Sequence, residues 1–298
     1  MTECESLFAE GCGHPGENIF SHLYVETPSG VFEDLESEIN KAINNDKVKT
    51  EAVEKIHPEI NCYYNSVNVF VGRQGAGKGY QALTEIIKIS KVSPITHMLL
   101  YVSKYGTESD KTFESMKHLI QIPIIYVKYK DEDKNKDCVQ VFSKIQCYKR
   151  LYEEIKNKHL EDEIEDEQRD EMFEVLHINS FDAPTLHTLI LFDDVANNPL
   201  IQKNGFFAEM LGVCRHIHCS FFLTIQFWKS ITTEIKANVS TIFIFGLYSK
   251  QQLHVMLYQI PTHYSFEEIY ECYKSLQKHD CLIVDANAGE IKIYTKTH

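Results

Sequence analysis

Short apolar runs alternate with helical patterns over most of the chain from residue 61 onward. Five runs have the length and the β-branched or aromatic residues of buried strands: 67–71, 98–102, 187–192, 219–225 and 241–245. After the first run, Leu83, Ile86, Ile87 and Ser90 follow the i, i+3, i+4, i+7 spacing of one helix face. Alternating strands and helices are typical of a parallel sheet. We therefore expect an α/β fold with a mainly parallel sheet and helices on both faces.

The regular alternation is interrupted once, which suggests how the chain is organised. Residues 1–60 are expected to be an N-terminal extension, and residues 61–298 one domain with an insertion at about 105–185. The insertion and the tail are expected to contain these elements: a strand at 122–127, a charged turn at 128–137, a helix at 139–155, a helix at 266–276, and a hairpin of strands 281–285 and 290–294 joined by a turn at 287–289.

Charge and composition exclude two classes of protein. The formal net charge of −13, from 43 acidic and 30 basic residues, argues against a protein that coats nucleic acid through its overall field. Eight carboxylates lie within residues 161–171, which are expected to form a solvated helix face or loop. No apolar stretch approaches the roughly 20 residues that span a bilayer, and the N-terminus does not resemble a secretory signal. The nine cysteines are therefore expected to be reduced thiols in an intracellular protein.

The segment after the first strand has the spacing of a phosphate-binding loop, Gly-x-x-x-x-Gly-Lys. In such a loop the glycines let backbone N–H groups turn toward a phosphate, and the lysine reaches the β- and γ-phosphates. The apolar strand before it and the amphipathic helix after it are the context that this motif requires. The candidate nucleotide-binding residues are Gly72, Arg73, Gln74, Gly75, Ala76, Gly77, Lys78, Gly79 and Tyr80.

One position of this loop departs from the motif. The residue after Lys78 is ordinarily Ser or Thr, whose hydroxyl binds Mg²⁺, and here it is Gly79 followed by Tyr80. Either the metal is held through water and a downstream acid, or hydrolysis is impaired. The loop also resembles that of adenylate kinases, which carry Gly at the same position, but Tyr80 stands where those enzymes have Thr.

Two acids follow the apolar run 187–192, in the arrangement called Walker B. Asp193 and Asp194 are expected at the carboxyl edge of the sheet, next to the phosphate-binding loop. Asp193 would hold Mg²⁺, and Asp194 would orient and polarise an attacking water. The alternative is that the two acids only cap the start of a loop.

A further strand, 219–225, is flanked by two candidate catalytic residues. Gln226 follows the strand and could hydrogen-bond a γ-phosphate and the attacking water, while Arg215 precedes it and could reach the nucleotide of a neighbouring subunit. The alternatives are an arginine favoured by the dipole at a helix C-terminus, and a glutamine that faces water.

Together these motifs resemble those of one family, the poxvirus-type virion DNA-packaging ATPases of large DNA viruses, within the FtsK–HerA superfamily. The resemblance covers roughly residues 66–250 and is weak at 105–185. It implies a five- or six-subunit ring that hydrolyses ATP to pump double-stranded DNA into a capsid, with a capsid or portal-like protein as partner. By this resemblance Lys78 and Asp193 bind MgATP, Asp194 is the catalytic acid, Gln226 the sensor and Arg215 the candidate finger.

Two other functions remain open from the sequence. The loop with Gly79 also suits a nucleoside monophosphate kinase, although no arginine-rich substrate lid is recognisable. The same glycine suits a degenerate ATPase that binds nucleotide and serves as a structural ring subunit. The combination of Lys78, Asp193 and Asp194 favours a hydrolase over both. The protein is expected in the host cytoplasm, at sites of virus assembly, and in the virion.

Overall fold

The computed structural model describes residues 24–26, 63–93, 95–103, 110–128, 132–183, 185–194, 201, 205–246, 248–260 and 262–294. The segment 1–60, expected to be an N-terminal extension, lies outside the described residues except for β1 (Tyr24–Glu26). This strand pairs antiparallel with β4 (Ile124–Lys128) at one edge of the sheet.

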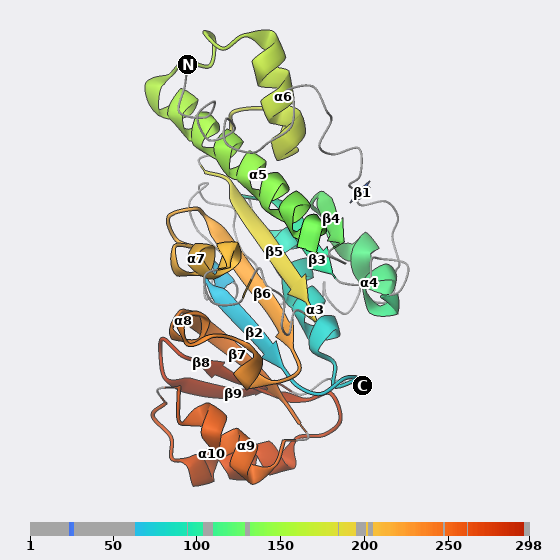
Figure 1. The fold of residues 1–298 in the computed structure, drawn as a ribbon, viewed down its shortest axis with the longest axis vertical. Coiled ribbons are helices and arrows are strands. Elements are labelled where there is room, and N and C mark those ends of the chain that lie inside the picture. Colours follow the sequence, from blue (N-terminus) through green and yellow to red (C-terminus); the bar gives the residue numbers. More distant parts are fainter. Residues whose placement is uncertain are drawn as a thin grey trace.

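A single mixed sheet runs through the part of the chain that the structure describes (Figure 1). Its nine strands lie in the order β1-β4-β3-β5-β6-β2-β7-β8-β9. The strands from β4 to β7 in this order are parallel, and β1, β8 and β9 join antiparallel at the two ends. The remaining strands are β2 (Val67–Val71), β3 (Thr96–Ser103), β5 (His187–Asp193), β6 (Cys219–Ile225), β7 (Val239–Phe245), β8 (Cys281–Asp285) and β9 (Glu290–Tyr294). The expected mainly parallel α/β fold is confirmed.

The order of the central strands places the motifs at one edge of the sheet. The strand before the phosphate-binding loop, β2, lies between β6 and β7, and β6 separates it from β5, which ends in Asp193. Because β2, β5 and β6 are parallel, their carboxyl ends meet at the same edge. In open α/β sheets this is the edge where ligands bind.

Helices cover both faces of the sheet, as expected. Alternate residues of each strand point to opposite faces, so the sheet has two cores. One core lies under α3 (Lys78–Val92) and α4 (Lys111–Met116), and the other lies under the remaining helices. Those helices are α5 (Glu132–Lys158), α6 (Asp166–Leu176), α7 (Phe206–Gly212), α8 (Thr233–Ala237), α9 (Lys250–Leu257) and α10 (Phe266–Ser275).

The core under α3 is rich in aromatic rings. Phe70 of β2 stacks on Phe243 of β7 with ring centroids 4.2 Å apart, and Phe222 of β6 lies 6.1 Å from the Phe70 ring on the other side. All three side chains are fully buried. Since the rings come from the three neighbouring strands around the phosphate-binding loop, this stack fixes the spacing of β6, β2 and β7.

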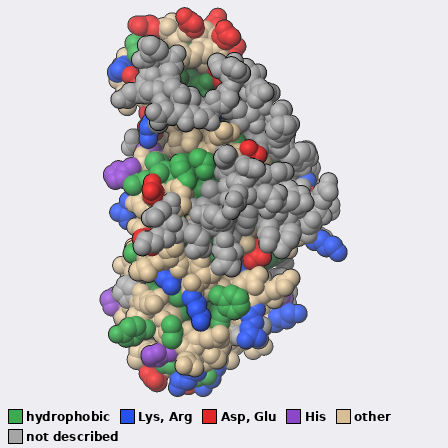
Figure 2. Space-filling model, viewed as in Figure 1, with side chains coloured by type: hydrophobic (Ala, Val, Ile, Leu, Met, Phe, Trp, Pro, Cys, Tyr) green, Lys and Arg blue, Asp and Glu red, His purple; other side chains and the backbone are tan. Residues whose placement is uncertain are grey.

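Some expected elements differ from the structure. A charged turn was expected over residues 128–137, but α5 already begins at Glu132, so the connection before this helix is shorter than expected. The acidic run forms exposed turns and the first half of α6, which confirms the expectation of a solvated face. Acidic side chains gather at the end of the molecule where α5 and α6 meet, and Lys and Arg side chains gather toward the opposite end (Figure 2).

Two further findings concern the cysteines and the helices. Among the described cysteines five are free thiols and Cys147 on α5 is disulfide-bonded, so the expectation of reduced thiols is wrong for Cys147. Among the described helices, none combines the length and apolar character needed to cross a lipid bilayer.

The aromatic stack generates a stability prediction. Phe222→Ala should lower the free energy of unfolding by about 3–5 kcal/mol, because it leaves a cavity between strands that cannot collapse. Chemical denaturation followed by circular dichroism measures this loss. Phe227→Ala is the matched control: its ring is 51% exposed, so a change within about 0.5 kcal/mol is expected. Equal losses in the two variants would contradict the assigned core.

Candidate nucleotide-binding site

The loop between β2 and α3 has the backbone of a phosphate-binding loop. Gly75 and Gly77 adopt positive φ angles of 73° and 103°, which residues with a side chain rarely adopt. Gly72 is required for a different reason: a Cβ there would lie 2.8 Å from Cβ of Phe245 at the end of β7. The loop therefore fits against the sheet only with glycines at these positions.

Lys78, the first residue of α3, lies at the centre of the site. Its Nζ atom donates a hydrogen bond to the carbonyl oxygen of Arg73 at 3.1 Å. Burial lowers the pKa of Lys78, and the nearby carboxylates of Asp194 and Asp193 oppose this shift. A partly buried ammonium group near two carboxylates is placed to interact with an anion that enters the site.

Asp193 and Asp194 are held by one hydroxyl group, that of Thr224 on β6. The Thr224 Oγ1 atom donates to Oδ1 of Asp193 at 2.6 Å and accepts from the backbone N–H of Asp194 at 2.8 Å. Burial raises the pKa of Asp193, while the Thr224 hydrogen bond lowers it and the nearby carboxylate of Asp110 raises it further. The sequence reasoning missed Thr224, although a hydroxyl residue in an otherwise apolar strand end was a usable signal.

Asp194 and Gln226 contact each other directly. The Gln226 side-chain amide donates from Nε2 to Oδ1 of Asp194 at 3.0 Å. The main chain of Asp194 has a positive φ of 49°, so the extended backbone of β5 ends at Asp193. The carbonyl oxygen of Gln226 accepts a hydrogen bond from the Tyr248 hydroxyl at 2.6 Å. Two of the expected catalytic residues are therefore brought together from neighbouring strands.

A pocket of about 780 Å³ joins these groups. Its lining includes Gln74, Gly75, Gly77, Lys78, Gly79 and Tyr80 of the loop and helix, with Asp193, Asp194, Thr224 and Gln226. Gly72, Arg73 and Ala76 complete the loop behind this lining. The opposite wall includes Asp110 and Thr112, and His279 closes the end beside the loop. The sequence reasoning missed these three wall residues, because each follows a segment with no recognisable motif.

The oxygen-rich side of this pocket suits a magnesium ion. Mg²⁺ prefers oxygen ligands and keeps several waters, so one carboxylate plus phosphate oxygens can hold it. Asp193 supplies such a carboxylate, and a Cβ on Gly79 would meet only Oδ1 of Asp193, at 3.9 Å. Gly79 therefore leaves open space beside Asp193, where a Ser or Thr hydroxyl ordinarily lies.

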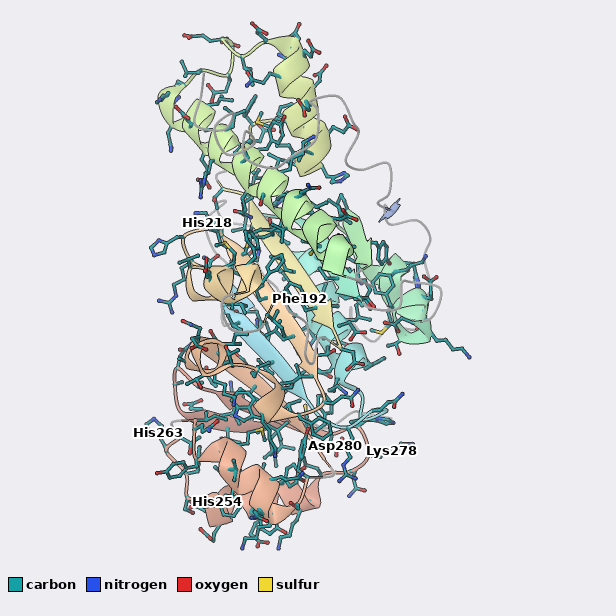
Figure 3. The ribbon with its side chains drawn as sticks, in the orientation of Figure 1. Phe192, His218, His254, His263, Lys278 and Asp280 are labelled. Atoms are coloured by element: carbon teal, nitrogen blue, oxygen red, sulfur yellow. The ribbon has the colours of Figure 1, made fainter. Side chains whose placement is uncertain are left out.

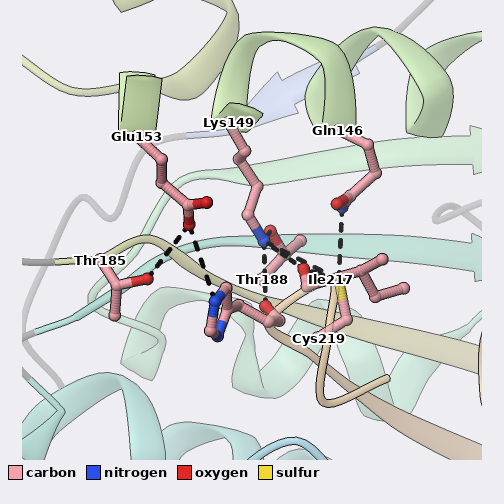
Figure 4. Close-up of polar contacts among 8 residues, drawn as sticks. Gln146, Lys149, Glu153, Thr185, Thr188, Ile217 and Cys219 are labelled. Atoms are coloured by element: carbon pink, nitrogen blue, oxygen red, sulfur yellow. Dashed lines mark hydrogen bonds and ion pairs between the residues drawn. The ribbon is translucent and has the colours of Figure 1, made fainter. Parts of the chain in front are cut away.

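Arg215 does not join the pocket. It is exposed in the turn after α7 and before β6, which places it at the amino edge of the sheet, opposite the edge with Lys78. Buried Lys149 of α5 holds this turn by donating to the carbonyl oxygens of Ile217 at 2.8 Å and His218 at 3.0 Å (Figure 4). The His218 ring also lies 3.7 Å from Glu153. Arg215 thus projects from a firmly anchored turn that is remote from the chain's own phosphate-binding loop.

The burial of Asp193 generates a prediction about pH. Because its pKa is raised in the folded protein, ionised Asp193 reduces stability at neutral pH, and Asp193→Asn should increase the free energy of unfolding at pH 7 by about 0.5–2 kcal/mol. The gain should shrink as pH falls through the raised pKa, because the wild-type carboxyl also becomes neutral. The gain should be smallest below about pH 3.8, the ordinary pKa of aspartate, which we take for the unfolded chain. Urea denaturation at several pH values measures the difference, and a gain that grows toward low pH would contradict the buried charge.

Comparison with known proteins supports the fold. No protein-family model matches the chain, and no curated protein matches it in sequence. The DNA-packaging ATPase of Sulfolobus turreted icosahedral virus is similar in structure, with a TM-score of 0.50, 16% identity, and coverage of 79% of this chain and 100% of that protein. The genome-packaging NTPase of Sulfolobus turreted icosahedral virus 2 in complex with ATP-gammaS gives a TM-score of 0.48, 16% identity and coverage of 80% and 100%.

A secretion ATPase is also similar in structure. The cytoplasmic domain of the type VII secretion ATPase EccC from Thermomonospora curvata gives a TM-score of 0.46 and 13% identity, with 86% of this chain and 31% of that chain covered. At such low identity the likeness concerns the fold. The chain has the α/β P-loop NTPase fold, as the resemblance to FtsK–HerA packaging ATPases implied, and it shares that fold with a viral DNA-packaging ATPase.

Proposed function

We propose that this protein hydrolyses ATP and uses the energy to move double-stranded DNA into a viral capsid. The observation that carries the proposal is the group of side chains around Thr224. Two aspartates and a glutamine, from two neighbouring strands, face the lysine of a phosphate-binding loop within one pocket. The fold shared with a viral DNA-packaging ATPase supports the coupling to DNA.

The phosphates of ATP would be bound by the loop and Lys78. Backbone N–H groups of the glycine-rich loop and the N-terminus of α3, a helix of 15 residues, present positive partial charge to an anion. Lys78 would exchange its hydrogen bond with the Arg73 carbonyl for one with the β- and γ-phosphates. The exchange is favourable because a neutral acceptor is replaced by a charged one, and charge-assisted hydrogen bonds are stronger.

Mg²⁺ would be held by Asp193 and would supply electrostatic stabilisation of the charge on the phosphates. Thr224 orients this carboxylate by donating to Oδ1. Gly79 leaves room for a water in place of the usual hydroxyl ligand. We therefore favour a metal site completed by water over a degenerate protein that binds nucleotide without hydrolysing it.

Asp194 would orient and polarise the attacking water, with Gln226 beside it. The Asp194 carboxylate can accept a hydrogen bond from water, and the Gln226 amide, already bound to Asp194, can contact both the water and the γ-phosphate. This direct contact between an acid and an amide favours the hydrolase over the monophosphate kinase, which transfers phosphate to a nucleotide and needs no acid to polarise water.

Arg215 would act on the nucleotide of a neighbouring subunit. Its position at the amino edge of the sheet puts it beyond reach of the chain's own loop, so the residue can serve catalysis only across a subunit boundary. This fits a ring of five or six subunits around double-stranded DNA, docked on a capsid or portal-like protein. The turn anchored by Lys149 would hold the guanidinium in place.

The role of Asp194 is tested by Asp194→Asn. Asparagine preserves the shape and tolerates the left-handed backbone, but it removes the charge that polarises water. ATP binding by calorimetry should be retained, while turnover should fall by about 10²-fold or more. Lys78→Ala is the companion variant, in which binding itself should weaken. Turnover within about twofold of wild type in Asp194→Asn would exclude Asp194 as the catalytic acid.

The role of Arg215 is tested by mixing two inactive variants. Arg215→Ala subunits should bind ATP and fail to hydrolyse it, and Lys78→Ala subunits should fail to bind. In a mixed ring, an intact Arg215 from a Lys78→Ala subunit can serve the intact loop of an adjacent Arg215→Ala subunit, so partial ATPase activity should return. Sedimentation with ATP and DNA monitors assembly in parallel. A mixture that forms rings and stays inactive would show that Arg215 does not act across subunits.

A further inference from the structure

The loop of residues 276–280, between α10 and β8, lies at the catalytic edge of the sheet because β8 is antiparallel. Cys281, the first residue of β8, pairs with Phe245, the last residue of β7. The amino end of β8 therefore meets the carboxyl ends of the parallel strands. Figure 3 labels Lys278 and Asp280, which belong to this loop, and His218, which precedes β6. The loop lies far from His218, and hence far from the amino end of β6.

His279 is the residue of this loop that enters the pocket. Its ring contacts the phosphate-binding loop: Nδ1 lies 3.3 Å from the carbonyl oxygen of Ala76, and the ring is within 3.3 Å of where a Cβ on Gly77 would stand. The side chain is partly buried and lines the pocket beside Gly77. His279 thus forms a wall of the nucleotide site, although it lies 201 residues beyond Lys78 in the numbering.

The loop holds His279 in a defined and locally strained conformation. Its φ is 77°, in the left-handed region that side chains rarely adopt. Asp280, which is buried, fixes the loop by accepting a hydrogen bond from the Gln277 N–H at 2.8 Å and donating its own N–H to the Gln277 carbonyl at 3.1 Å. Such strain persists only where surrounding contacts impose it. The contacts of this loop therefore fix the backbone at His279 and the position of its ring in the pocket.

The hydrogen bond to Ala76 decides what the other ring nitrogen can do. A carbonyl oxygen only accepts, so Nδ1 must carry the proton and donate. In the neutral imidazole Nε2 is then an acceptor. An acceptor suits a ribose hydroxyl or an exocyclic amine of a base and repels a phosphate oxygen. The chemistry of the free nitrogen therefore matches the nucleoside half of a nucleotide.

The order of the strands also places the nucleoside end of the ligand near His279. The groups suited to the terminal phosphate, Asp193, Asp194 and Gln226, come from β5 and β6, on one side of β2. His279 comes from the β7–β8 side. A nucleoside triphosphate is elongated, so if its terminal phosphate lies on the β6 side of the loop, the nucleoside is free to lie on the β7–β8 side.

We propose that His279 contacts the ribose or base of the bound nucleotide and contributes to selection of a nucleoside triphosphate over a bare polyphosphate. This inference rests on the proposed nucleotide site. It concerns recognition of the nucleoside, which hydrolysis and DNA translocation do not by themselves define.

The test compares two ligands that differ only in the nucleoside. Calorimetry with ATP and with inorganic tripolyphosphate is carried out on the full chain and on His279→Asn, because Asn tolerates the left-handed backbone while removing the ring. His279→Gly is the second variant, since Gly adopts this φ without strain. We expect ATP affinity to fall about tenfold, the scale of one lost polar or ring contact, and tripolyphosphate affinity to stay within about twofold.

His254→Asn is the matched control, because it makes the same substitution at an exposed histidine of α9 that does not line the pocket. It should leave both affinities unchanged. A selective loss of ATP binding in this variant would show that the effect does not depend on the pocket wall and would overturn the proposal. Equal losses for both ligands in the His279 variants, or no loss for either, would also overturn it while leaving the nucleotide site intact. A wild-type protein that binds neither ligand would refute the nucleotide site itself, and the role of His279 with it.

Discussion

The Thr224 hydroxyl is the interaction on which the geometry of the site depends. It accepts a hydrogen bond from one residue of the aspartate pair and donates to the other, so both acids are positioned by a single side chain of the adjacent strand. This requires β5 and β6 to be in one register: Phe192 pairs with Leu223, and the next residues along are Asp193 and Thr224. A shift of one residue would turn Thr224 to the other face and leave Asp193 buried without this partner.

The two cores make that register secure. Aromatic rings of β2, β6 and β7 stack under α3, and mostly aliphatic residues of the same strands pack under the helices of the other face. Because both faces are buried, a strand cannot slide without exposing apolar surface or burying polar groups. Apolar contacts several residues away thus hold the polar residues at the strand ends in place. The same contacts position the loop between β2 and α3.

The sequence predicted the parts of this arrangement that are local. The strand before Gly72, the loop to Lys78 and the acids after β5 are each read from a few consecutive residues, and the structure brings the loop and the acids into one pocket. Asp110 and His279 were missed because their roles depend on contacts between distant segments. The hydroxyl of Thr224 was a local signal, but its partners, Asp193 and Asp194, follow from the pairing of β5 with β6. For His279 the decisive fact is that β8 runs antiparallel to β7, which no local pattern encodes. The strand Tyr24–Glu26 was not predicted either, because its place in the sheet depends on pairing with β4, about 100 residues further along the chain.

The backbone at Asp194 limits how this site can change over generations of mutation. Its positive φ admits Gly, Asn and Asp with little strain and penalises most other residues. Glutamate has the same charge, but it would be strained at this φ, whatever its carboxylate could do in the site. Among replacements that keep the fold relaxed, Asn and Gly both remove the carboxylate. Aspartate is therefore the residue that combines a carboxylate with a side chain suited to this backbone.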